Sequence, residues 1–293
     1  MRINLPTNDF SFFKFLSGTL ILLTALIFPF FTAYSYIIPL MVGRAHTLGA
    51  WLGMWRAGKL NWIYVTWMIA LTVSISYWGL ALSTIATLTF VTNLFFTFHF
   101  LFDEFYLQEE QHTLGNVLSM LSPFVLLYIF LIGGFFASPI PFALYLAIAG
   151  TFLVVEMIYL EEMNWFFFHS KILTLFVLIS IYLGKPSWNI IGILLIFHYF
   201  FWFIYPVHRL HKSRPEERNG FIMILLLLVG TSIYFSFTRS SYGPEILEVT
   251  LRTFLIGTLI HILGTAPFGY FFGLPRQKRQ LKAHDIVPSP QTS

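Results

Sequence analysis

The chain has 293 residues, of which 57% are hydrophobic and only 10% are charged. A soluble protein of this length carries about 25% charged residues, so the composition excludes a large soluble enzyme and predicts a membrane protein. The chain has no cysteine, which excludes thiolate metal sites and cysteine nucleophiles and leaves histidine and carboxylate side chains as candidate ligands. The net charge of +4 comes mostly from short loops between apolar runs, which indicates membrane topology and not nucleic-acid binding.

Ten apolar segments are each long enough to cross a hydrocarbon core about 30 Å thick as a helix of about 20 residues. In chain order they cover residues 15–31, 34–55, 61–79, 83–105, 116–136, 140–160, 167–184, 188–207, 220–238 and 246–271. Residues 1–272 are therefore predicted to form an all-α, polytopic integral membrane helical bundle with about ten transmembrane helices. Residues 273–293 are predicted to form a basic cytoplasmic tail.

The basic residues test this topology, because lysine and arginine accumulate in the cytoplasmic loops of membrane proteins. With the N-terminus inside, almost all loop lysines and arginines fall on the cytoplasmic side, and only Lys185 and Arg239 fall outside. We therefore expect both termini in the cytoplasm and the bundle in a bacterial inner membrane or its equivalent. His208 and His211 lie in one of the basic loops, where we expect them to face anionic lipid headgroups.

Ionisable side chains inside a membrane are costly, so each one is a candidate functional residue. The even-numbered segments all run toward the cytoplasm and carry such residues at or beyond their midpoints, so several helices can point at one site. The candidates are His46, His99, Asp103, Glu156, His198 and His261, together with His169 at the start of segment 167–184.

A metal centre is the sharpest interpretation of these residues. His46, His99, His169, His198 and His261 are the predicted metal ligands. Imidazole and carboxylate together suit iron, zinc, manganese or copper, and we expect a transition metal, with iron favoured and zinc as the alternative. Asp103 lies four residues after His99 and therefore on the same helix face.

Asp103 and Glu156 are the predicted catalytic carboxylates. They act either as ligands or as bases that fix the histidine tautomers by accepting the second ring proton. Phenylalanine and tryptophan are dense around the candidate histidines, as in residues 95–102, 165–168 and 197–203. An aromatic cavity would suit a long apolar or polyene substrate that enters from the bilayer, although the same residues also suit plain packing.

Several familiar motifs are missing from the sequence. It contains no phosphate-binding glycine loop, no Gly-x-Ser-x-Gly nucleophile elbow and no His-Glu-x-x-His helix. The clustered histidine boxes of membrane desaturases are also missing. The histidines are instead dispersed over separate segments, so only a folded bundle can assemble them.

The dispersed pattern resembles the bacterial Brp/Blh family of β-carotene-cleaving dioxygenases, which are polytopic membrane proteins with iron-binding histidines. The resemblance rests on His99-x-x-x-Asp103 and on the glycine-flanked His46. It implies a non-haem iron centre that brings dioxygen to a polyene, with His46, His99, His198 and His261 as candidate ligands.

The leading hypothesis is an integral-membrane, metal-dependent oxidoreductase that acts on a hydrophobic small molecule or lipid. One alternative is a haem-binding electron carrier in which two histidines ligate the haem and small residues such as Gly49 and Gly264 leave space for the porphyrin. The other alternative is a proton-coupled transporter in which histidine and glutamate form a relay.

Overall fold

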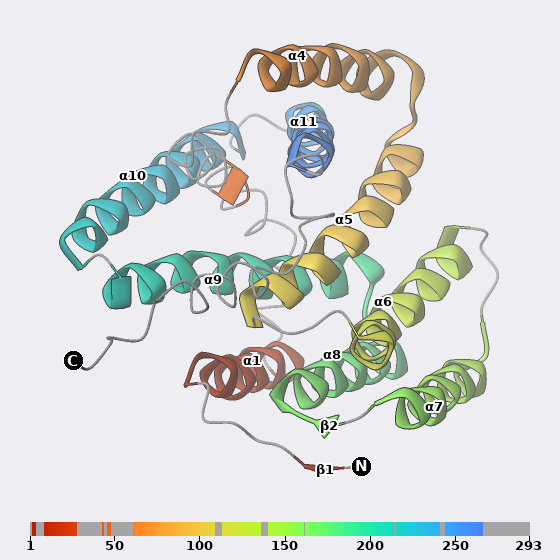
Figure 1. Ribbon diagram of the computed structural model, residues 1–293. Coiled ribbons are helices and arrows are strands. Elements are labelled where there is room, and N and C mark those ends of the chain that lie inside the picture. The colour runs from red at the N-terminus through yellow and green to blue at the C-terminus, as the bar shows by residue number, and fades with distance from the viewer. Residues whose placement is uncertain are drawn as a thin grey trace, which may run out of the picture.

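The computed structural model describes residues 2–3, 9–27, 43, 46–47, 61–108, 113–135, 140–160, 162–213, 215–240 and 244–265 (Figure 1). These residues are almost entirely helical, and two strands of two residues each, β1 (Arg2–Ile3) and β2 (Glu162–Met163), pair in parallel. The helices are α1 (Asp9–Ile27), α4 (Trp62–Tyr77), the π-helix η1 (Trp78–Leu82), α5 (Ile85–Gln108), α6 (Leu114–Phe135), α7 (Phe142–Tyr159), α8 (Trp165–Tyr182), α9 (Ser187–Ser213), α10 (Pro215–Ser240) and α11 (Pro244–Thr265).

The described helices confirm the all-helical class and coincide with the predicted segments. Within the described ranges, four stretches are long and apolar enough to cross a membrane, namely 62–82, 114–134, 142–159 and 165–182. Shorter apolar stretches lie in α1, α5, α9 and α11. Predicted segment 34–55 and the predicted tail 273–293 lie outside the described residues, apart from Gly43, His46 and Thr47. The total of ten spans and the cytoplasmic side of the termini stay predictions.

Local sequence sets several helix boundaries. Asn61 and Asn164 precede α4 and α8, and the side-chain oxygen of each accepts a hydrogen bond from the backbone N–H three residues later, at 2.9 and 3.0 Å. This satisfies a donor that the first helical turn leaves without an intrahelical partner. After α8, Gly184 adopts a positive φ of 64°, which glycine tolerates without strain and which ends the helix.

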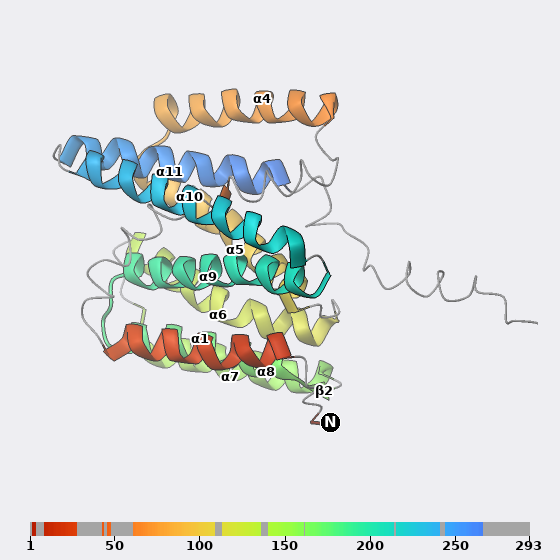
Figure 2. The same ribbon diagram turned by 90° about the vertical axis from the view of Figure 1, so that its left-hand side faces the viewer.

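The helices form two packed groups that α5 and α9 connect. One group contains α1, α6, α7 and α8, and the other contains α4 and α11 (Figures 1 and 2). Helices α5, α9 and α11 run in the same direction through the bundle (Figure 2). The three helices are inclined to one another, since Figure 1 shows α11 nearly end-on and α9 lengthwise, but their common direction agrees with the expectation for the even-numbered segments.

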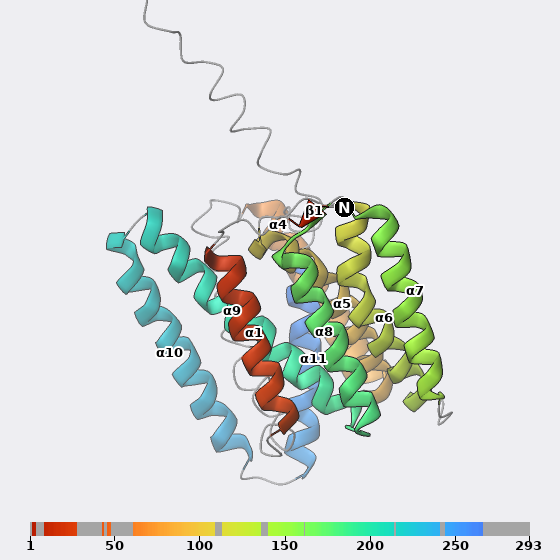
Figure 3. The same ribbon diagram turned by 90° about the horizontal axis from the view of Figure 1, so that it is seen from below.

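The outer helices expose large apolar side chains. Trp62 on α4 is 84% exposed and Ile158 on α7 is 70% exposed, and α10 similarly exposes Met223 and Leu227. Figure 3 places α7 and α10 at opposite edges of the bundle. Apolar patches of this extent are costly in water and favourable in hydrocarbon, so the outer surface is that of a membrane-associated protein.

Two basic side chains bind backbone carbonyl groups at helix ends. The Arg252 guanidinium on α11 donates hydrogen bonds to the carbonyl oxygens of Gly79 and Ser83, at 2.7 and 2.9 Å, where η1 ends. The Lys185 ammonium, in the turn between α8 and α9, donates to the carbonyl of Leu26 at the end of α1, at 3.4 Å. Partial burial lowers the pKa of this lysine. Both contacts satisfy carbonyls that lack an intrahelical donor.

Candidate metal centre

Four histidines meet in the interior of the bundle. His99 lies on α5, His198 on α9 and His261 on α11, and His46 lies in the segment between α1 and α4. All four residues are buried, with exposures of 6% or less. The sequence predicted that these four residues share one site, and the structure brings them together from segments that are far apart in the chain.

The rings lie close enough for their nitrogen atoms to surround one ion. His46, His99 and His198 each offer a ring nitrogen, and these three atoms all lie within 4.8 Å of one another. His261 completes the group, because its ring centroid lies 5.1 Å from that of His46 and 5.2 Å from that of His99. We call these four residues the histidine cluster.

Asp103 adds a carboxylate to the histidine cluster. Its Oδ2 atom lies 3.3 Å from Nε2 of His99 and 3.5 Å from Nε2 of His198. The Trp202 indole donates a 2.6 Å hydrogen bond to the same oxygen and fixes its position. Because Asp103 lies one helical turn after His99, the predicted i,i+4 pair is present and both members face the cluster.

No role for Trp202 was predicted from the sequence, although its spacing from His198 indicates one. It follows His198 by four residues on α9, as Asp103 follows His99 on α5. Two helices therefore each present a histidine and, one turn later, one partner of the Trp202–Asp103 hydrogen bond. A search for polar or indole side chains one turn from each intramembrane histidine would have found this residue.

Several buried polar atoms of this site lack a hydrogen bond within the described part of the chain. They are Nε2 of His46, both ring nitrogens of His99 and His198, and Oδ1 of Asp103. More than about 90% of buried polar groups in proteins have a hydrogen-bond partner, so several such atoms in one place need an explanation. A bound metal ion would supply the missing partner for imidazole nitrogen and carboxylate oxygen alike.

The spacing also fits the geometry of a metal ion. Two nitrogen ligands, each about 2.1 Å from one ion, lie at most about 4.2 Å apart. The 4.8 Å spread among His46, His99 and His198 needs a contraction of less than an ångström to reach that limit. The Asp103 contacts of 3.3 and 3.5 Å already fall inside it. The buried group of His46, His99 and His198 can therefore hold a metal ion.

Aromatic rings enclose the histidine cluster. Tyr199 packs against His46 with ring centroids 4.9 Å apart, and Phe96 and Phe100 lie 5.6 and 5.3 Å from the His198 ring. These contacts keep the imidazoles in an apolar environment and restrict their rotamers. The aromatic density that the sequence showed around residues 95–102 and 197–203 thus includes direct neighbours of the candidate ligands.

His169 lies in a different buried group. Its Nε2 atom lies 3.1 Å from Oε2 of Glu104, which also forms an ion pair with Lys14. Lys14 and Glu104 are fully buried, and the Lys14 ammonium lies 5.0 Å from the centroid of the Phe201 ring. Glu104 directly follows Asp103 on α5, so this ionic group is the immediate neighbour of the histidine cluster along that helix.

Glu156 also has its own partner. Its buried carboxylate on α7 forms an ion pair with Lys171 on α8, and the Lys171 ammonium lies 5.2 Å from the centroid of the Phe167 ring. The sequence grouped Glu156 with the histidines because of its similar depth. Depth alone could not reveal that α7 packs against α6 and α8 in the group away from α11 (Figure 1).

Comparisons of this chain with protein-family models, with curated proteins and with solved structures found no match.

Proposed function

We propose that this chain is an integral-membrane metalloenzyme that binds a transition metal ion at the histidine cluster and oxidises a lipid-soluble substrate. The observation that carries the proposal is the convergence of four buried imidazoles and the Asp103 carboxylate, in which both ring nitrogens of His99 and His198 have no hydrogen bond within the described residues. Within this donor set, three nitrogen ligands and one adjacent oxygen leave open coordination positions, as catalytic centres require.

The geometry favours a single ion over a haem group. The imidazoles contact one another directly, with centroid distances of 5.1 to 5.4 Å among adjacent pairs, and no porphyrin plane fits between rings in such contact. A Cβ atom on Gly264 would collide with Met68, so the space expected beside this glycine is already filled. Gly49, the other small residue considered for a porphyrin, lies outside the described residues.

The surroundings of the site support a lipid-soluble substrate. The cluster is buried among aromatic and aliphatic side chains, and the outer helices face lipid with large apolar residues. Iron is the favoured ion, because nitrogen and carboxylate ligands with open positions are typical of non-haem iron oxygenases, and bound iron would supply dioxygen chemistry. Asp103, held by Trp202, lies 3.3 and 3.5 Å from Nε2 of His99 and His198, so its carboxylate could bind the same ion as these two imidazoles.

Metal analysis of the detergent-purified full chain tests the metal site. The wild-type protein should contain about one iron or zinc ion per chain, and the His99→Ala/His198→Ala variant should contain none. His211→Ala is the matched control, because this exposed histidine lies at the far end of α9 and its loss should leave the metal content unchanged. Circular dichroism and thermal unfolding report whether each variant folds.

Well-folded wild-type protein that binds no added iron or zinc would refute the metalloenzyme and favour a carrier with a histidine relay. A Soret band would favour the haem protein. Oxidation itself is tested by adding β-carotene, as a polyene probe, to iron-loaded protein under dioxygen and analysing the products. Conversion by wild type but not by His99→Ala/His198→Ala supports the proposed chemistry, and no conversion of polyene or fatty acyl probes argues against it.

A further inference from the structure

A second feature lies between α9, which ends at Ser213, and α10, which begins at Pro215; the two helices diverge from these ends (Figures 1 and 3). Side chains from both helices line a pocket with a volume of about 530 Å³. This volume falls in the range of about 300 to 1,000 Å³ that is typical of small-molecule sites. The proposed metal chemistry does not use this pocket.

One part of the pocket is an apolar slot, formed by Phe203, Leu225, Leu226 and Val229. Leu226 is 62% exposed, so the slot opens on the outer surface of α10, where Met223 and Leu227 are also exposed. In a bundle whose outer surface faces hydrocarbon, such a slot is open to lipid chains and not to water.

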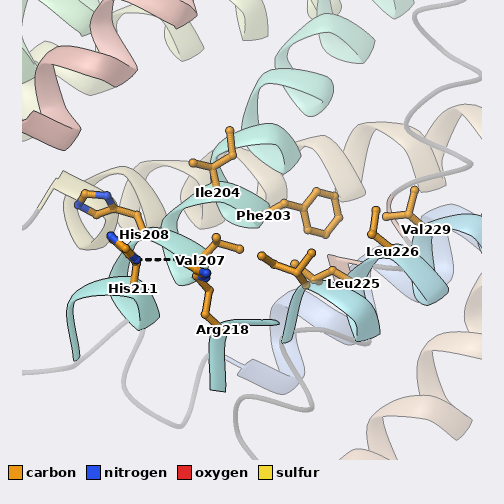
Figure 4. Close-up of a pocket in the computed structure, with 10 residues that line it drawn as sticks. Phe203, Ile204, Val207, His208, His211, Arg218, Leu225, Leu226 and Val229 are labelled. Atoms are coloured by element: carbon orange, nitrogen blue, oxygen red, sulfur yellow. Dashed lines mark hydrogen bonds between the residues drawn. The ribbon is translucent and has the colours of Figure 1, made fainter. Parts of the chain in front are cut away.

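The other end of the pocket is a basic rim, formed by His208, His211 and Arg218 (Figure 4). The Arg218 Nη1 atom lies 2.8 Å from Nδ1 of His211, and this contact holds the two side chains side by side across the α9–α10 turn. In the sequence, residues 208–218 also include three further basic residues, against two acidic ones: Arg209, Lys212 and Arg214, against Glu216 and Glu217.

The pocket and the metal centre use opposite faces of α9. At about 100° per residue, His198 and Trp202 lie within about 40° of each other, whereas Val207 lies about 180° from His198. Val207 lines the pocket and His198 belongs to the histidine cluster. The pocket is therefore a separate site, and α9 separates it from the metal.

The geometry points to an anionic phospholipid as the ligand of this pocket, with its phosphate at the basic rim and an acyl chain in the apolar slot. Arginine binds phosphate through paired N–H groups, and a phosphate would take the place of the exposed Asn219, whose Oδ1 accepts from Nε and Nη2 of Arg218. His211, whose Nδ1 accepts from Arg218, adds its Nε2–H as a further donor. Positive charge at one end and apolar side chains at the other match the two chemical halves of such a lipid. The rim lies at the helix ends, where headgroups of a bilayer would be found (Figure 2).

Native mass spectrometry of the detergent-purified full chain tests this site. The probes are phosphatidylglycerol, phosphatidylcholine with the same acyl chains, and glycerol 3-phosphate as the headgroup without a chain. The His211→Gln/Arg218→Gln variant should bind phosphatidylglycerol at least about tenfold more weakly, the loss expected for one hydrogen bond between charged groups. Its phosphatidylcholine binding and its metal content should not change.

Two further variants control the experiment. Val229→Phe fills the slot while leaving the rim intact, and should also weaken phosphatidylglycerol binding. Lys185→Gln removes a positive charge at the opposite end of the bundle, and should leave the lipid affinity unchanged (Figure 2). His211→Gln alone, at an exposed position, serves if the double variant unfolds.

Three results would overturn the assignment. They are equal phosphatidylglycerol affinity in wild type and the rim variant, an equal loss in Lys185→Gln, or glycerol 3-phosphate binding as tightly as the lipid. The last result would identify a site for a soluble anion.

Discussion

Glu104→Gln should be among the most destabilising single substitutions in this protein. The Glu104 carboxylate forms an ion pair with the Lys14 ammonium, and both side chains have 0% exposure. The substitution leaves the Lys14 charge buried without its ion-pair partner. Removing one member of a buried ion pair costs about 3 to 5 kcal/mol in unfolding free energy, because the remaining ion keeps its full desolvation penalty.

The Glu156–Lys171 pair provides a matched control. Glu156 is fully buried, but the Lys171 side chain is 20% exposed, so its ammonium can reach water when the partner is removed. Lysine also extends its flexible stem toward the interface when its head is charged. Glu156→Gln should therefore cost clearly less than Glu104→Gln, although both remove one carboxylate charge from an ion pair within the bundle.

Reversible unfolding of the detergent-purified variants by sodium dodecyl sulfate measures this difference. The Lys14→Met/Glu104→Gln variant should recover most of the stability lost in Glu104→Gln, because it removes the isolated charge and keeps the apolar stem beside Phe201. Equal losses for Glu104→Gln and Glu156→Gln, or no recovery in the double variant, would refute the reasoning from burial.

Three further predictions concern the metal centre and the helix packing. Asp103→Asn should weaken metal binding at least about tenfold in a competition titration, because it removes the carboxylate charge beside two candidate ligands. Gly115→Ala should lower the unfolding free energy by about 1 to 3 kcal/mol in the same unfolding assay, because a Cβ there would lie 2.8 Å from a backbone oxygen. Gly134→Ala, on the same helix, is the control: its Cβ meets nothing within 4 Å, so the substitution should be neutral or stabilising. Arg252→Gln should cost about 1.5 to 3 kcal/mol in that assay, because it removes charged hydrogen bonds to two carbonyls, and an unchanged stability would contradict this role.

The helices could be predicted from sequence because hydrocarbon forces the backbone to satisfy its own hydrogen bonds. Each apolar run of sufficient length therefore becomes a helix whatever its detailed residues are. Segments 142–159 and 165–182 illustrate this, since each differs from its predicted range by only a few residues. The same rule gives segment 34–55 by length alone, because the apolar stretch 15–55 contains no charged loop that would mark a helix end, and most of this segment lies outside the described residues.

The histidine cluster could also be predicted, because burying an imidazole in an apolar helix is costly unless it has a partner. His46, His198 and His261 lie at similar predicted depths, with His99 somewhat nearer the cytoplasm, and helices that run in one direction bring related depths together. The same reasoning also grouped His169 and Glu156 with them. These two residues lie outside the cluster because their helices, α7 and α8, pack against α6 and α1. Which helices are neighbours cannot be predicted from the periodicity of the sequence.

The positions of Lys14 and Lys171 explain why their buried ion pairs with Glu104 and Glu156 were not predicted. The positive-inside rule places Lys14 and Lys171 at the cytoplasmic side, and it treats both as loop charges. A lysine near a helix end can equally turn inward when a carboxylate lies at the same level on a neighbouring helix, and Glu104 and Glu156 provide these partners. A carboxylate that follows an apolar run, with a lysine at matching depth on another segment, is therefore better interpreted as a candidate buried pair. On this criterion the two carboxylates at the end of α5 have different partners. Asp103 faces the histidine cluster, and Glu104 compensates the buried charge of Lys14.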